Sequence, residues 1–110
     1  MVKLSGKKIN TAVFISGRGS NLKSLIEFNK KKNSPILIKL IISDNPNAKG
    51  LVYAKKSKIA KYVVNYKNKN ISEKKLLKKL ANYRISLICL AGFMKILSKN
   101  FIKKFNNPIL

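Results

Sequence analysis

Three features of this sequence of 110 residues predict an α/β fold with a mostly parallel sheet and flanking helices. Short apolar runs alternate with amphipathic segments, which is the order of a fold built from strand and helix units. The runs at residues 40–42 and 87–90 are apolar on both faces, as in strands that helices cover on both sides. Successive strands joined through helices run parallel with right-handed crossovers. We therefore expect a half-Rossmann arrangement.

Each of the four expected strands corresponds to one apolar run. Their predicted positions are residues 9–15, 36–43, 62–65 and 85–90. The third run gives the weakest signal, because it is short and ends in Asn.

Amphipathic segments between and after these runs predict helices, because apolar residues three and four positions apart share one helical face. The residues with this spacing are Leu22, Leu25 and Ile26, then Leu76, Leu77 and Leu80, and finally Phe101, Ile102 and Phe105. Ser72 and Ser98 are predicted N-caps, since a serine hydroxyl can accept a free main-chain N–H. The pair Asn45-Pro46 predicts a further helix start, because proline is favoured at the first helical position.

Several catalytic sites are excluded by composition. The chain has no histidine, one cysteine and three acidic residues, Glu27, Asp44 and Glu73. It cannot build a Cys/His zinc site, a Ser-His-Asp triad or a pair of catalytic carboxylates, and we expect no metal. The single cysteine, Cys89, lies in an apolar run and is interpreted as a core residue. Without a possible internal disulfide, a reducing, cytoplasmic location is expected.

The charge of the chain is strongly positive, with 25 basic residues and a formal net charge of +22. Such a charge attracts nucleic acids. However, only two of the basic residues are Arg, and the lysines are spread over every segment instead of forming a stripe. We therefore favour drift toward Lys, Asn and Ile codons in an A+T-rich genome, with a basic nucleic-acid-binding module as the alternative.

A glycine-rich turn at residues 16–21 follows the first strand and leads into the first helix. Glycines let the backbone approach a ligand closely, and the free N–H groups of a helix start favour a phosphate. The turn lacks the Gly-Lys-Ser/Thr ending of a Walker A loop, and Leu22 replaces the third glycine of a dinucleotide motif. The expected ligand is a mononucleotide or sugar phosphate. The alternative is an ordinary turn with Ser20 as N-cap.

Three segments resemble phosphoribosylglycinamide formyltransferases. They are residues 13–22, residues 42–46 with Ala48 and Gly50, and residues 90–98 with the sequence Leu-Ala-Gly-Phe-Met-Lys-Ile-Leu-Ser. The similarity runs in order from about Ile9 to Leu110. It implies a Rossmann-like formyltransferase fold.

The resemblance implies transfer of a formyl group from 10-formyltetrahydrofolate to the amine of glycinamide ribonucleotide, a step of purine biosynthesis. It places the ribonucleotide phosphate on Gly19, Ser20 and Asn21. This agrees with the mononucleotide preference of the glycine-rich turn.

For the folate, the resemblance implies contacts with Met94, Lys95, Ile96 and Leu97. A gapless match also places Lys69 where the family has a folate-contacting arginine. The implied partners are these two small molecules, with 10-formyltetrahydrofolate as co-substrate, and neither a membrane nor a specific nucleic acid.

The catalytic residues of the family have no counterpart in this sequence. They are an Asn and a His in an Asn-Ile-His-Pro segment and a later Asp, which stabilise the oxyanion and handle the proton of the amine. The resemblance places them beyond Leu110. We therefore expect residues 1–110 to be the nucleotide-binding, N-terminal portion of one truncated domain, inactive by itself. A formyltetrahydrofolate deformylase is an alternative that shares the folate site but holds no nucleotide phosphate.

Overall fold

The computed structural model of the chain describes residues 8–110, and a four-stranded sheet forms its centre. All strands are parallel, in the order β3-β2-β1-β4. The predicted α/β class and parallel sheet are confirmed. Residues 1–7 of the predicted domain lie outside the described residues.

The two central strands, β1 (Ile9–Ile15) and β2 (Ile36–Ser43), have the bounds that the sequence predicts. Their pairing is interrupted by a β-bulge at Lys39: Ile38 and Leu40 pair with consecutive residues of β1. Ile38 packs on one face of the sheet and Leu40 on the other. The extra residue thus changes the face to which the following side chains point.

The two edge strands are displaced from their predicted positions. β3 (Ala60–Val63) begins and ends two residues early, because the side chain of Asn65 accepts a main-chain N–H and starts a turn. β4 (Leu87–Leu90) begins two residues late. The N–H of Ile85 bonds to the carbonyl of Leu80 at 2.9 Å, so this residue belongs to the turn after the preceding helix and does not start the strand.

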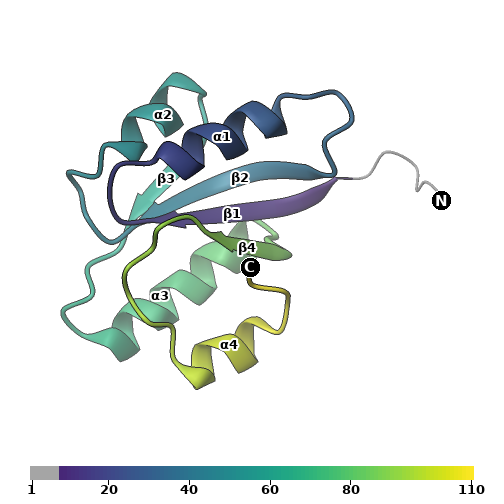
Figure 1. The fold of residues 1–110 in the computed structure, drawn as a ribbon. Helices are drawn as coiled ribbons and strands as arrows, with labels where there is room; N and C mark the ends of the chain where they lie inside the picture. Colours follow the sequence, from purple (N-terminus) through teal and green to yellow (C-terminus); the bar gives the residue numbers. More distant parts are fainter. Residues whose placement is uncertain (1–7) are drawn as a thin grey trace.

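Helices cover both faces of the sheet (Figure 1). Within residues 8–110 they are α1 (Ser20–Asn29), α2 (Gly50–Lys56), α3 (Lys69–Asn82) and α4 (Lys99–Phe105). The helices α1 and α2 lie on one face, and α3 and α4 on the other. Alternate side chains of β1 enter the two cores: Val13 and Ile15 pack on the α1 side, and Ala12 and Phe14 on the α3 side.

One of the two predicted serine caps is confirmed. The Ser98 hydroxyl accepts the N–H of Phe101 at 3.0 Å and caps α4. The prediction for Ser72 is wrong, because α3 begins four residues earlier, after Asn68, whose side chain caps it. Ser72 is buried inside the helix and donates its hydroxyl to the carbonyl of Asn65.

The predicted helix start at Asn45-Pro46 is also wrong. The N–H of Ala48 bonds to the carbonyl of Asn45 at 3.1 Å, which closes a turn. The hydroxyl of Ser43 both accepts the Asn45 N–H and donates to its carbonyl. This turn delays the start of α2 until Gly50.

The strand order locates the crevice where ligands of such sheets bind. The chain crosses from β3 at one edge to β4 on the other side of β1. Ligands of parallel sheets bind beyond the carboxyl ends of the strands where the strand order reverses, which here is between β1 and β4. Within residues 8–110, no helix is long and apolar enough to cross a bilayer.

Candidate functional site

The glycine loop, residues 16–19, joins β1 to α1. Gly19 is the N-cap residue, with a φ of 81° that glycine adopts without strain. Its carbonyl accepts the N–H of Lys23 at 2.8 Å, and no side chain caps the helix. The alternative interpretation of Ser20 as N-cap is therefore wrong, since Ser20 is the first helical residue.

The first turn of α1 has the groups that an anion would need. Ser20 and Asn21 are exposed there, next to the N–H groups that a helix start leaves without intrahelical partners. The positive end of the helix dipole lies at the same place. The glycine loop and the first turn of α1 therefore together offer main-chain and side-chain donors to one phosphate-sized group.

A second glycine supports this loop from α2. A Cβ atom added to Gly19 would collide with the Cα atom of Gly50, and one added to Gly50 would lie 2.6 Å from Cδ1 of Ile15. The N–H of Gly50 also bonds to the carbonyl of Gly17 at 3.2 Å. The start of α2 thus holds the glycine loop in place.

The β4 loop, residues 91–98, is anchored by an aromatic cluster. The ring of Phe93 meets that of Phe14 edge to face, with centroids 5.2 Å apart, and that of Tyr66 at 6.0 Å. Edge-to-face contacts of this kind add to the energy of burial. Phe93 therefore fixes the middle of the loop onto the sheet.

The predicted folate-contacting residues lie along the outer part of the β4 loop. Met94 and Ile96 are 78% and 80% exposed, Lys95 is exposed, and Leu97 packs against the core beside α3. The main-chain groups of residues 95–97 form no hydrogen bond with any other residue in the range 8–110. Exposed apolar side chains beside free main-chain donors and acceptors suit a flat heterocycle with polar edges.

Two hydrogen bonds join the β4 loop to the glycine loop and the strand before it. The N–H of Ala91 bonds to the carbonyl of Phe14, and the N–H of Met94 bonds to Oγ of Ser16, each at 2.8 Å. The side-chain amide of Asn45 reaches the carbonyl of Ser16 at 3.5 Å. The glycine loop and the β4 loop are thus in contact at the carboxyl ends of β1 and β4.

Lys69 is less closely associated with this edge. It is exposed and is the first residue of α3. None of the hydrogen bonds found within residues 8–110 joins it to the β4 loop. Its assignment to the folate site stays a prediction.

Two buried polar atoms have no hydrogen-bond partner within residues 8–110: the hydroxyl of Tyr66, whose ring contacts Phe93, and Oδ1 of Asp44. Burial, with the nearby charges of Glu73 and Asp44, raises the pKa of Tyr66 to about 12. The phenol is therefore neutral at physiological pH. It can donate a hydrogen bond but is a poor base.

Cys89 lies in β4 and packs against the core on the α1 side. Burial raises the pKa of its thiol. This disfavours the thiolate, in agreement with its interpretation as a core residue. Within residues 8–110, no cluster of three His, Cys, Asp or Glu side chains could hold a metal ion.

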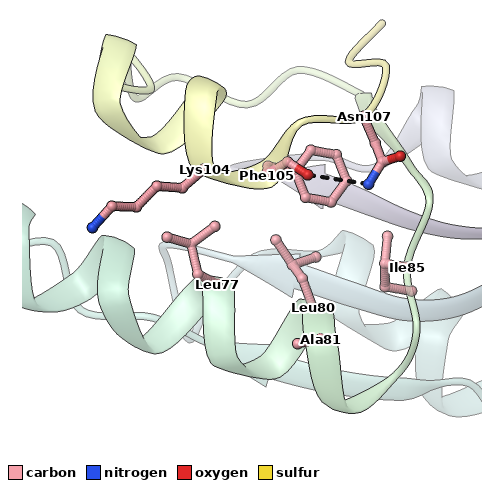
Figure 2. A pocket seen from close by; sticks show the side chains of 7 residues that line it. All are labelled: Leu77, Leu80, Ala81, Ile85, Lys104, Phe105 and Asn107. Atoms are coloured by element: carbon pink, nitrogen blue, oxygen red, sulfur yellow. Dashed lines mark hydrogen bonds between the residues drawn. The ribbon is translucent and has the colours of Figure 1, made fainter.

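A separate hollow lies between α3 and α4, away from the predicted site residues (Figure 2). It measures about 280 Å³. Its lining consists of Leu77, Leu80, Ala81, Ile85, Lys104, Phe105 and Asn107. Side chains from the two helices face each other across it, and the Asn107 amide donates to the carbonyl of Phe105 at 3.1 Å.

Sequence reasoning did not single out Ser16, Tyr66 or Glu73. Their partners lie far away in the chain: the bond from Met94 to Ser16 spans 78 residues, and that from Ser98 to Glu73 spans 25. Of these residues, Ser16 could have been found from its position, because it directly follows a strand whose carboxyl end faces the crevice.

Comparison with known proteins gives a consistent result. Residues 9–110 match the formyl transferase family. The chain is 39% identical over 107 residues to the human trifunctional purine biosynthetic protein adenosine-3, covering 94% of this chain and 11% of that protein. It is 37% identical to the phosphoribosylglycinamide formyltransferase of Haemophilus influenzae, covering 94% of this chain and 50% of that one.

Solved structures agree with the sequence matches. The phosphoribosylglycinamide formyltransferase of Brucella melitensis superposes with a TM-score of 0.89 at 34% identity, over 94% of this chain and 55% of that one. The enzyme of Anaplasma phagocytophilum gives 0.85 at 35% identity, over 94% and 48%. The chain thus spans about half the length of the relatives named phosphoribosylglycinamide formyltransferase and about a tenth of the human protein.

Proposed function

The chain belongs to the formyl transferase family, and we propose that it forms the ligand-binding half of a phosphoribosylglycinamide formyltransferase domain. Such an enzyme moves a formyl group from 10-formyltetrahydrofolate to the amine of glycinamide ribonucleotide in purine biosynthesis. The observation that carries the proposal is the hydrogen bond from the Met94 N–H to Oγ of Ser16. It joins the loop suited to a phosphate to the loop suited to a heterocycle, as a reaction between two bound substrates requires.

The glycine loop binds the ribonucleotide phosphate in this proposal. The free N–H groups at the start of α1 and the side chains of Ser20 and Asn21 donate to its oxygens. Gly19 lets the backbone approach closely, since it has no side chain and a left-handed φ. The phosphate thereby fixes the ribonucleotide at the carboxyl end of β1.

The β4 loop binds the folate. Met94 and Ile96 cover the pterin ring with apolar surface, and the main chain of residues 95–97 pairs with its polar edge. Lys95 and Lys69 add positive charge where the glutamate tail of the folate carries carboxylates. The expected folate residues are therefore Met94, Lys95, Ile96, Leu97 and Lys69.

Formyl transfer itself needs groups that this sequence does not supply. The amine attacks the formyl carbon, whose oxygen becomes an oxyanion, and a base removes the amine proton. The bond from the formyl carbon to the folate nitrogen then breaks, and tetrahydrofolate leaves. The chain has no histidine to act as that base. The Tyr66 phenol cannot replace one, because its raised pKa keeps it protonated at neutral pH. We propose that the 110-residue chain binds both substrates, acts in the cytoplasm and does not transfer the formyl group alone.

Titration calorimetry on the 110-residue chain tests this function. Saturable binding of glycinamide ribonucleotide and of 10-formyltetrahydrofolate is expected, with no formylated product. Failure to bind either ligand would contradict the proposal, and detectable product would contradict its last part. Folate binding without ribonucleotide binding would favour a deformylase. Tight DNA binding that weakens steeply with salt would favour a nucleic-acid-binding module.

A further inference from the structure

A buried carboxylate lies behind the β4 loop. Glu73 is in the second turn of α3 and is only 5% exposed. Burying a carboxylate is costly unless hydrogen bonds compensate it. Both of its oxygens are used by one residue: Oε2 accepts the Ser98 N–H at 2.9 Å, and Oε1 accepts the Ser98 hydroxyl at 2.5 Å.

Ser98 is the last residue of the β4 loop and the N-cap of α4. Its hydroxyl accepts the Phe101 N–H while donating to Glu73. One carboxylate therefore fixes both the end of the loop and the entry of the next helix. Hydrogen bonds to charged groups are among the stronger ones in proteins, which suits an anchor.

The two ends of the β4 loop are thus held from outside the loop. At its start, the N–H groups of Ala91 and Met94 bond to Phe14 and Ser16. At its end, Glu73 holds Ser98. The segment between these anchors contains the exposed side chains and free main-chain groups assigned above to the folate. A binding loop held in its bound shape loses less entropy when the ligand arrives.

We propose that Glu73 is a positioning residue for folate binding, which acts through Ser98 without touching the ligand. This inference rests on the proposed function, because it assigns the β4 loop to the folate. Glu73 should affect the affinity for the folate but not that for the ribonucleotide, because Glu73 supports the β4 loop, whereas Gly50 holds the glycine loop.

Three variants test the role of Glu73. Glu73→Ala removes both bonds, and its Kd for 10-formyltetrahydrofolate is expected to rise at least tenfold, with the Kd for glycinamide ribonucleotide unchanged within twofold. Glu73→Gln is expected to restore most of the folate affinity, because its amide can accept the Ser98 N–H and donate to the Ser98 hydroxyl. Glu27→Ala, at an exposed position of α1, is the matched control and should change neither constant.

The results for these variants either support or overturn the positioning role of Glu73. If Glu73→Ala does not fold, as judged by circular dichroism, Ser98→Ala replaces it and should show the same selective loss of folate affinity at a smaller size. Unchanged folate affinity in the folded variant, or an equal loss for both ligands, overturns the positioning role. Absence of folate binding by the unmodified chain overturns the proposed function itself and, with it, this inference.

Discussion

The glycine loop and the β4 loop follow neighbouring parallel strands, and each contains a glycine with nearly the same positive φ angle. The φ angles are 81° at Gly19 and 78° at Gly92. Their surroundings differ: a Cβ atom on Gly19 would strike Gly50, whereas one on Gly92 would meet no atom within 4 Å. The same backbone angle therefore serves close packing in the first loop and only a change of chain direction in the second.

The two loops also differ in what they present. The glycine loop offers polar donors at a helix start, and another helix supports it. The β4 loop offers exposed apolar side chains and is fixed by side chains of three other elements. This difference fits our proposal of an anion at the first loop and a heterocycle at the second.

The largest expected effect separates the two glycines. Gly19→Ala combines left-handed strain of about 1–2 kcal/mol with overpacking of about 1–3 kcal/mol, for a loss near 3 kcal/mol in unfolding free energy. Gly92→Ala meets open space and should lose only about 1 kcal/mol. Urea unfolding measures both. Equal losses would show that the contact with Gly50 contributes little.

A smaller effect is expected on the affinity for glycinamide ribonucleotide when donors at the start of α1 are removed. Ser20→Ala and Asn21→Ala each remove one donor to a charged phosphate, worth about 1.5 kcal/mol, or roughly tenfold in Kd for glycinamide ribonucleotide. Folate affinity should stay the same. Ser24→Ala, one turn further along α1, is the control. A loss of folate affinity in the first two variants would contradict the assignment of separate loops.

Removing the link between the loops should have a weaker effect on both ligands. Ser16→Ala deletes the acceptor of the Met94 N–H, a bond worth about 0.5–1 kcal/mol at an exposed position. We expect the affinities for both ligands to fall about two- to fivefold, as measured by calorimetry. If only one affinity changes, Ser16 belongs to that ligand's site and does not couple the two.

The smallest effect at neutral pH is expected for Tyr66→Phe, which keeps the ring contact with Phe93 and removes a buried hydroxyl that has no partner within residues 8–110. At alkaline pH we expect a larger difference in unfolding free energy between the unmodified chain and Tyr66→Phe. The pKa of Tyr66 is raised from 10.0 to about 12 in the folded chain, so the folded state favours the neutral phenol. This contribution to stability is complete below pH 10 and is lost as the pH rises toward 12.

Urea unfolding of both chains at several alkaline pH values measures this change. The unmodified chain should lose more unfolding free energy across this range than Tyr66→Phe, because the variant has no phenol to ionise. The comparison isolates the contribution of this phenol, because the two chains differ at no other residue. Parallel losses would mean that the environment of Tyr66 does not favour the neutral form.

The parts of the fold that the sequence predicts are those determined by local patterns. Apolar runs give β1 and β2 their observed bounds, and the serine before α4 caps it as expected. Ser72 carries the same capping signal, but Asn68 stands before it in the chain and caps α3 first. Two capping residues compete there, and Asn68 is used, whereas the Ser72 hydroxyl donates to the carbonyl of Asn65.

The candidate site likewise has one part that local sequence patterns predict and one part that they do not. The glycine loop was predictable, because its donors lie within a few residues of each other. The anchors of the β4 loop were not, since Ser16 and Glu73 reach their partners only after the sheet and α3 have packed. No local pattern in the sequence specifies a hydrogen bond across 78 residues.

The β-bulge at Lys39 has a consequence for how this strand tolerates changes in length. Deleting Lys39 would leave a regular strand, with Ile38 and Leu40 still on the faces they occupy now. Deleting Ile41 instead would turn Ile42 toward the wrong core. The bulge is therefore the position in β2 where a codon can be lost without inverting the buried pattern.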